Sequence, residues 1–462
     1  MKSSRFQPLL FTYLYVAELS GLVVALYLYK KNPAAAEFFV PSVIGRRDLF
    51  AAFALTLTLL SIAGIYRYYV LTRRDQSRDF TLVLCTNLVS LVFIVVSSEV
   101  TLRLTALKTA QGVSILTMPL RPYSWNDVAD HYREILNRNL PENSYFIYDP
   151  DLGWVVGPSR RSKDGLYFSS TEGIRSAGAG VSFTDISTHH HVAIVGDSFT
   201  FGLEVKYEDT WAYHLERALG PDARVLNFGV DGYGVDQSYL RFQRDVRNWR
   251  PDIVLFGLIE HDVWRSMAVY SFISFPQWDF PFAKPRFSMD SGLVELLNRP
   301  LPRPDTLFAK KSIQDLPYIE YDPGYHEQEW TWHPYHHSML IRVLLSRFWP
   351  QAESNLKASP DIVKQINGSL MLKFMSAALA DGAVPITVYF PSRQDFWPTP
   401  SLMAKTIFRE AGIPYIDLTS CVAAIDPADR FLPGRPHYSA KANEAVAHCL
   451  SELMPPHMSN SL

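Results

Sequence analysis

The sequence predicts a three-layer α/β domain built on a parallel sheet and preceded by a membrane anchor. Two observations lead to this prediction. From about residue 191, short apolar segments alternate with helix-like segments, which is typical of parallel sheets covered by helices on both faces. Before residue 100, three long apolar runs follow one another. The chain has 462 residues, too many for one typical core, so more than one structural unit is expected.

The three apolar runs cover about residues 9–29, 49–66 and 80–98. Each is long enough to cross, as a helix, the roughly 30 Å hydrocarbon core of a bilayer. Lys and Arg residues flank the runs in equal numbers on the two sides, so the positive-inside rule does not give an orientation. The sequence therefore predicts a three-span anchor over residues 1–103 whose orientation is not fixed by charge.

Residues 104–190 are expected to form a connector and a small β-rich annex. A helix is predicted over 124–139, because Ser124 is a good N-cap and Asp127 follows in the first turn. The stretch 148–176 combines glycines, an Asp-Pro pair and short aromatic pieces, which indicates turns and short strands.

The alternating pattern continues over residues 191–455, which we take as the α/β domain. Strands are expected at 191–195, 224–228, 253–258, 386–390 and 414–418, and helices at 209–219, 236–249, 337–347, 361–380, 402–411 and 437–453. Right-handed crossovers then place helices on both faces, and ligand sites lie at the carboxyl ends of the strands. The pattern breaks at 263–335, a Pro- and aromatic-rich insert that either packs as ordinary core or forms a wall for a sugar or an acyl group.

The charge and the cysteines limit the partners that the sequence predicts. The formal net charge of −2 gives no general attraction to nucleic acid, so no nucleic-acid partner is expected. No arrangement of His, Cys and carboxylates points to a metal, and no cofactor is implied. Cys421 and Cys449 can pair if the domain folds in an oxidising compartment, but the sequence leaves their pairing open.

Four segments carry residues suited to acyl transfer, and the first three follow predicted strands. "GDSFTFG" (196–202) places Ser198 at a strand-to-helix turn, where its hydroxyl and its N–H are exposed together. In "NFGVDGYG" (227–234) a glycine-rich turn lets another N–H approach closely. "PDIVLFGLIEHDV" (251–263) ends in the polar pair His261 and Asp262, and "PHYSAKANEAVA" (436–447) offers His437 as a base.

In this order, the four segments resemble the conserved blocks of the GDSL or SGNH hydrolase superfamily, in its membrane-anchored bacterial envelope type. The resemblance covers about 190–450 apart from the insert, and "DPDLGW" (149–154) is similar to a segment found ahead of this domain in membrane-tethered relatives. It implies a flavodoxin-like parallel sheet, with Ser198 as nucleophile, His437 as base and Gly232 as an oxyanion donor. Polar or aromatic residues near these blocks are candidate substrate contacts: Asp197, Asp262, Trp264, Arg265 and Arg435.

Two positions depart from the family pattern. His261 stands where the family has Asn, and a neutral histidine still has one N–H to donate to an oxyanion. Gly434 stands three residues before His437, where the family has the Asp that orients the histidine. Three explanations stay open: Asp429 replaces that Asp, the enzyme works as a Ser–His dyad, or activity has been lost.

The resemblance implies a membrane-anchored serine esterase or O-acyltransferase that uses a Ser–His acyl-enzyme mechanism. Its expected substrates are acyl esters, such as acetyl esters, of an envelope carbohydrate or lipid. The expected location is the inner membrane, with the catalytic domain facing the periplasm or the outside, where envelope polysaccharide machinery is a candidate partner. The alternative is a catalytically degenerate scaffold that binds glycans or assists polysaccharide assembly.

Overall fold

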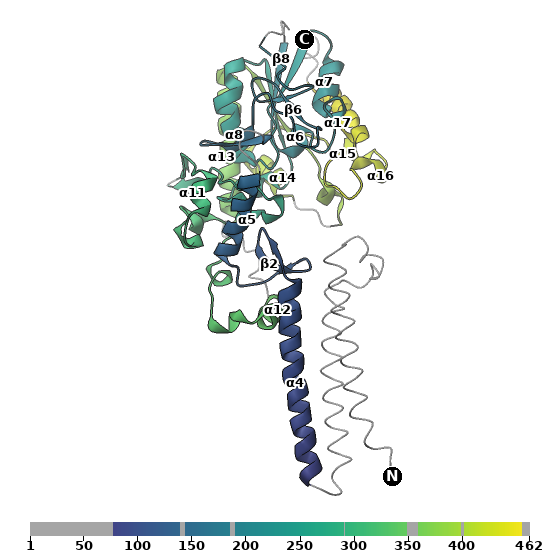
Figure 1. The fold of residues 1–462 in the computed structure, drawn as a ribbon. Helices are drawn as coiled ribbons and strands as arrows, with labels where there is room; N and C mark the ends of the chain where they lie inside the picture. Colours follow the sequence, from purple (N-terminus) through teal and green to yellow (C-terminus); the bar gives the residue numbers. More distant parts are fainter. Residues whose placement is uncertain are drawn as a thin grey trace. The chain divides into compact units, whose positions relative to one another are not determined.

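The computed structural model describes residues 77–138, 144–184, 190–290, 292–348, 359–398 and 402–454. These residues form two compact units, shown in Figure 1. The first unit takes its described residues from 1–128 and 327–351, and the second from 129–326 and 352–462. The predicted apolar runs at 9–29 and 49–66 lie outside the described residues.

The first unit combines one long helix with a small sheet and a segment from far along the chain. α4 (Ser77–Thr105) is followed by an antiparallel sheet of β1 (Leu107–Thr109), β2 (Gly112–Ile115) and β3 (Met118–Pro119). α12 (Met339–Phe348) packs against α4, and the Glu99 carboxylate accepts from the N–H groups of Met339 and Leu340 at 2.9 and 3.0 Å. The helix expected at 337–347 therefore exists, but it belongs to this unit and not to the α/β layers.

The predicted run at 80–98 is helical and lies within α4. Among the residues that the structure describes, no helix is both long enough and apolar enough to cross a membrane.

The second unit contains a five-stranded parallel sheet. Its strands are β8 (His190–Val195), β9 (Ala223–Asn227), β10 (Ile253–Leu258), β13 (Val384–Tyr389) and β14 (Tyr415–Asp417). All five expected strands are present to within two residues at each end. The spatial order β14-β13-β10-β8-β9 is the flavodoxin-like order, in which the connections change direction between the first and third strands of the sheet. That switch point lies between β8 and β10, and Ser198 follows β8 directly.

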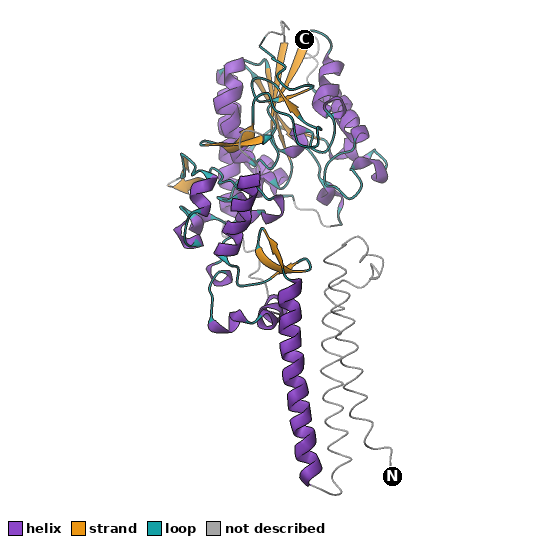
Figure 2. Cartoon of the chain, viewed as in Figure 1, coloured by secondary structure: helices purple, strands orange, loops and turns teal. Residues whose placement is uncertain are grey.

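Helices cover both faces of this sheet (Figure 2). α7 (Trp211–Leu219), α15 (Thr419–Ala423) and α17 (Ala440–Leu453) pack on one face, and α8 (Val235–Arg241), α13 (Pro360–Ala380) and α14 (Met403–Ala411) pack on the other. Alternate residues of β8 supply both cores: Val192 and Ile194 join the first, and Ala193 and Val195 join the second. The predicted three-layer arrangement is confirmed.

The annex and the insert add short elements to the second unit. α5 (Trp125–Arg138) has its first four residues in the first unit and the rest in the second, and it begins as expected after Ser124, whose Oγ accepts from the Asp127 N–H at 3.3 Å. The annex consists of two antiparallel hairpins, β4 (Phe146–Asp149) with β5 (Gly153–Val156) and β6 (Phe168–Ser169) with β7 (Arg175–Ser176). The insert holds α9 (Asp262–Arg265), α10 (Ser271–Ser274), the hairpin of β11 (Phe287–Asp290) and β12 (Leu293–Leu296), and α11 (Pro304–Phe308), whereas its last residues, from 327 onward, belong to the first unit.

A disulfide bond joins Cys421 and Cys449, a pairing that the sequence left open. It ties α15 to α17, two helices on the same face of the sheet. His437 lies three residues before α17, so the bond anchors the helix that follows this histidine.

Candidate active site

The turn after β8 holds Ser198 in a buried position. A Cβ on Gly196 would lie 2.5 Å from the Gly257 carbonyl oxygen, so only glycine fits where the strand turns. The Asp197 side chain then caps α6 (Ser198–Phe201) by accepting from N–H groups of its first turn. Ser198 is the first residue of this helix, so its own N–H is one of those that a helix leaves unpaired.

Ser198, His437 and Glu204 form a continuous chain of hydrogen bonds. His437 Nε2 lies 2.9 Å from Ser198 Oγ, and His437 Nδ1 lies 2.7 Å from Glu204 Oε2. A carboxylate that accepts from Nδ1–H leaves Nε2 free to take the serine proton. This is the arrangement that turns a serine hydroxyl into a nucleophile.

Glu204 is the residue that sequence reasoning missed. The expected substitute, Asp429, does not orient His437, because its carboxylate pairs with Lys441 at 2.7 Å. A bare Ser–His dyad is also wrong, since His437 Nδ1 has a carboxylate partner. The family pattern places the orienting acid just before the histidine, whereas Glu204 comes from the loop after α6. The sequence feature that points to Glu204 is its position, a carboxylate only six residues after the candidate nucleophile Ser198.

Arg435 lies at the exposed edge of this chain of hydrogen bonds. Its Nη1 is 3.4 Å from Glu204 Oε1, and its side chain is 68% exposed. Among the five expected substrate contacts, it is the one that the structure leaves on the surface.

Hydrogen bonds to Trp154 of the annex fix the turn around Gly232. Gly232 has a φ of 78°, and a Cβ there would lie 3.3 Å from the rings of both Trp154 and Trp278, so a larger residue would be strained and crowded. Trp154 Nε1 donates to the Asp231 carbonyl at 2.9 Å, and Tyr233 Oη donates to the Trp154 carbonyl at 2.6 Å. Thus the "DLGW" segment holds both sides of the turn that carries the candidate oxyanion donor.

Two backbone donors are available for an oxyanion. In the described part of the chain, neither the Ser198 N–H nor the Gly232 N–H donates to another group. Such free, fixed N–H groups stabilise the negative oxygen of an acyl-transfer intermediate.

His261 lies directly before α9, at the carboxyl end of β10. Burial and the positive charge of Arg265 lower the pKa of His261. A lowered pKa keeps the imidazole neutral near pH 7, with one N–H to donate. Its side chain forms no hydrogen bond with the other described residues, so this donor is available to a ligand.

Asp197 and Asp262 are buried beside the site and share one guanidinium. Arg265 Nη1 donates to Asp262 Oδ1 at 2.7 Å and contacts Asp197 Oδ2 at 3.1 Å. Both carboxylates are buried, and burial together with the charge of Asp197 raises the pKa of Asp262. The expectation that they contact substrate therefore fails, because they share a guanidinium inside the protein.

Trp264 and Arg265 also differ from expectation. Trp264 is partly buried and packs against the hydrophobic core that lies between the sheet and α13. The Arg265 side chain is only 11% exposed, and its guanidinium lies 5.0 Å from the centre of the Trp278 ring. Arg265 thus links the buried carboxylates to the aromatic insert, which packs against the site at this point.

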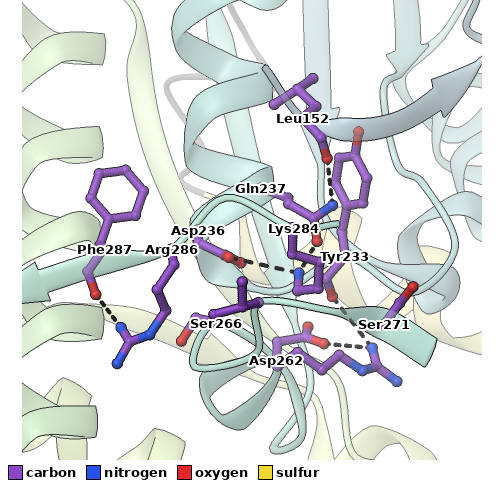
Figure 3. A network of polar contacts seen from close by, with 12 residues as sticks. Leu152, Tyr233, Asp236, Gln237, Asp262, Ser266, Ser271, Lys284, Arg286 and Phe287 are labelled. Carbon is purple, nitrogen blue, oxygen red and sulfur yellow. Dashed lines mark hydrogen bonds and ion pairs between the residues drawn. The ribbon is translucent and has the colours of Figure 1, made fainter. Parts of the chain in front are cut away.

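A buried lysine joins the insert, α8 and the annex (Figure 3). Lys284 Nζ lies 3.6 Å from Asp236 Oδ2 and donates to Gln237 Oε1, while Gln237 Nε2 donates to the Leu152 carbonyl at 2.7 Å. Burial lowers the pKa of Lys284 to about 8. In the same view, Asp262 lies close to this network.

No protein-family model and no curated protein matches the chain. Solved structures do match. The chain resembles the GDSL/SGNH hydrolases.

Three of these structures illustrate the similarity. A lipolytic protein of the G-D-S-L family from Desulfitobacterium hafniense DCB-2 is 12% identical, with a TM-score of 0.30, over 58% of this chain and 100% of that one. The acetyl-xylooligosaccharide esterase Axe2 from Geobacillus stearmophilus, as a mutant, is 13% identical, with a TM-score of 0.30, over 58% and 94%. A two-domain esterase active on acetylated mannans is 14% identical, with a TM-score of 0.30, over 59% and 50%.

Proposed function

We propose that the chain is a serine esterase or O-acyltransferase of the SGNH type. The observation that carries this proposal is the unbroken hydrogen-bond chain from Ser198 through His437 to Glu204. Glu204 also removes the main reason for regarding the chain as a degenerate scaffold, since the orienting carboxylate is present at another position.

The proposed reaction proceeds through an acyl-enzyme. Ser198 Oγ attacks the ester carbonyl carbon while His437 Nε2 takes the hydroxyl proton. The carbonyl oxygen becomes negative and accepts from the N–H groups of Ser198 and Gly232, with His261 as a third donor. His437 then gives its proton to the departing alcohol oxygen, leaving the acyl group on Ser198. Water or a sugar hydroxyl then attacks the acyl carbon while His437 takes its proton, and His437 returns a proton to Ser198 Oγ as the acyl group leaves. Attack by water gives hydrolysis, and attack by a sugar hydroxyl gives transfer.

We propose that the substrates are acyl esters, with acetyl esters foremost, of an envelope carbohydrate or lipid. The Cys421–Cys449 disulfide supports a domain that folds in an oxidising compartment outside the cytoplasm. On α4, Val89, Leu91, Val92 and Phe93 are each more than half exposed, so an apolar surface surrounds this part of the helix. Together with the apolar runs of the sequence, this surface supports a membrane tether for the catalytic unit.

Covalent labelling tests the proposed chemistry. A fluorophosphonate probe reacts only with an activated serine, so it should label the full-length chain in detergent and fail to label Ser198→Ala. Wild-type protein that resists the probe would overturn the proposal. A panel of chromogenic esters and acylated glycans, with and without sugar acceptors, then separates hydrolysis from transfer.

Reporter fusions test the proposed location. A phosphatase that is active only in the periplasm, fused after residue 110, should be active. A fluorescent reporter that matures only in the cytoplasm should be dark at the same point, and the reverse pattern would contradict the proposed orientation.

A further inference from the structure

The β6–β7 part of the annex lies against the loop that carries Glu204. We propose that Tyr167 and Arg175 are positioning residues for the Ser198–His437–Glu204 chain, which makes the annex a working part of the active site. This inference rests on the proposed function, since it explains how the orienting carboxylate is held.

The backbone at Glu204 needs external support. Its φ is 69°, the left-handed region that residues other than glycine seldom adopt. A residue persists in this conformation only when its surroundings fix it, and such residues concentrate at functional sites. The loop from Leu203 to Val205 therefore requires contacts on both sides of Glu204.

Tyr167 provides the first of these contacts. Its Oη accepts from the Glu204 N–H at 2.9 Å. Burial raises the pKa of Tyr167 to about 12, so the phenol stays neutral at physiological pH. A neutral phenol oxygen beside the backbone of Glu204 fixes the loop without repelling the carboxylate.

Arg175 provides the second contact, on the other side of Glu204. Its Nη2 donates to the Val205 carbonyl at 2.9 Å. The side chain is fully buried, and its guanidinium lies 4.5 Å from the centre of the Tyr167 ring and 4.6 Å from that of Phe201. Aromatic faces attract a cation, so the two rings stabilise the buried guanidinium of Arg175.

Phe201 makes this arrangement relevant to catalysis. It is the last residue of α6, the helix that begins with Ser198. One buried guanidinium thus contacts the helix of the nucleophile, the ring of Tyr167 and the loop of the orienting carboxylate. The separation between Glu204 and Ser198 is therefore set by annex side chains as well as by the sheet.

The test removes one oxygen atom. Tyr167→Phe keeps the ring under Arg175 and deletes only the acceptor for the Glu204 N–H. Tyr270→Phe is the matched control, because Tyr270 Oη donates to the Pro317 carbonyl at 2.6 Å in the insert. Three quantities are measured on the full-length chain: steady-state kinetics with a chromogenic acetate ester, the rate of fluorophosphonate labelling, and the downfield proton resonance of His437 Nδ1–H.

Tyr167→Phe should lower kcat and the labelling rate about 3- to 10-fold, the effect of one lost hydrogen bond, with KM unchanged. It should also shift or broaden the His437 resonance, whereas Tyr270→Phe should match wild type in all three. A Tyr167→Phe protein that equals wild type in all three measurements would overturn the inference, and so would a Tyr270→Phe control that loses kcat and labelling rate to the same extent as Tyr167→Phe.

The resonance separates this inference from the proposed function. If wild-type protein is neither labelled nor active, the proposed chemistry fails. The resonance, assigned by its loss in Glu204→Gln, still reports whether Tyr167 controls the contact between Glu204 and His437.

Discussion

Glu204 Oε2 lies 2.7 Å from His437 Nδ1, although the two residues are 233 positions apart in the sequence. Glu204 comes soon after β8, the strand of the parallel sheet that is first along the chain, and His437 comes shortly before α17. Glu204→Gln should lower kcat by roughly 10³- to 10⁴-fold, because an amide no longer fixes the tautomer or stabilises the imidazolium. Steady-state kinetics on a chromogenic ester measures this loss.

Asp429→Asn is the control for that substitution, since Asp429 pairs with Lys441 and not with the histidine. It should retain wild-type turnover. If Asp429→Asn is the damaged variant and Glu204→Gln is active, the assignment of the orienting carboxylate is wrong.

Much of the fold was predictable because each strand carries its own signal. The apolar segments ending at Val195 and Leu258 are short, are followed by polar residues and alternate with helices, so periodicity alone located them. The approach of Ser198 to His437 was also predictable from the motifs, since both flank the carboxyl edge of the sheet. Neither inference required knowledge of side-chain packing.

The remaining features depend on packing that a sequence does not display. Glu204 reaches His437 through a left-handed residue held by the annex, and no spacing rule encodes that contact. The sequence predicts substrate contacts for Asp197 and Asp262 because both are polar residues at the motif blocks, but the guanidinium of Arg265 stabilises both inside the protein. A sequence shows that a side chain is charged, but whether that side chain is buried depends on the oppositely charged group that the fold places beside it.

His261 should act as an oxyanion donor. His261→Ala should then lower kcat by about 10²- to 10³-fold, the usual cost of one such donor, with little change in KM. His261→Asn should recover much of that loss, because its amide restores a side-chain N–H. Kinetics on one ester decides between the roles: if Asn is as inactive as Ala, donation is not what His261 supplies, and if both equal wild type, the residue is structural.

The buried pair of Lys284 and Asp236 should control stability. Lys284→Met leaves the Asp236 carboxylate buried without its cation, which costs about 3–5 kcal/mol in comparable pairs. Adding Asp236→Asn removes the orphaned charge, so the double variant should regain most of the loss. Urea unfolding of the second unit measures both, and equal midpoints for the single and double variants would show that the charge pair is not responsible.

Asp231 should make stability depend on pH. Burial raises the pKa of Asp231 from its ordinary value of 3.8 to about 6, with Asp197 and Glu204 adding negative charge and His437 and Arg265 opposing them. A raised pKa means that the folded state binds the proton more tightly than the unfolded state does. The stability from this group is therefore present below pH 4 and is lost as pH rises to about 6.

Asp231→Asn removes this titration, since an amide stays neutral at every pH. The variant and wild type should have similar melting temperatures at about pH 4, where the side chain at position 231 is uncharged in both folded proteins. As the pH rises toward 7, the variant should become progressively more stable than wild type. Thermal unfolding at intervals of half a pH unit tests this prediction. Only a shifted pKa makes the difference in melting temperature between variant and wild type depend on pH. A difference that stays constant from pH 4 to pH 7 would therefore show that folding does not raise the pKa of Asp231.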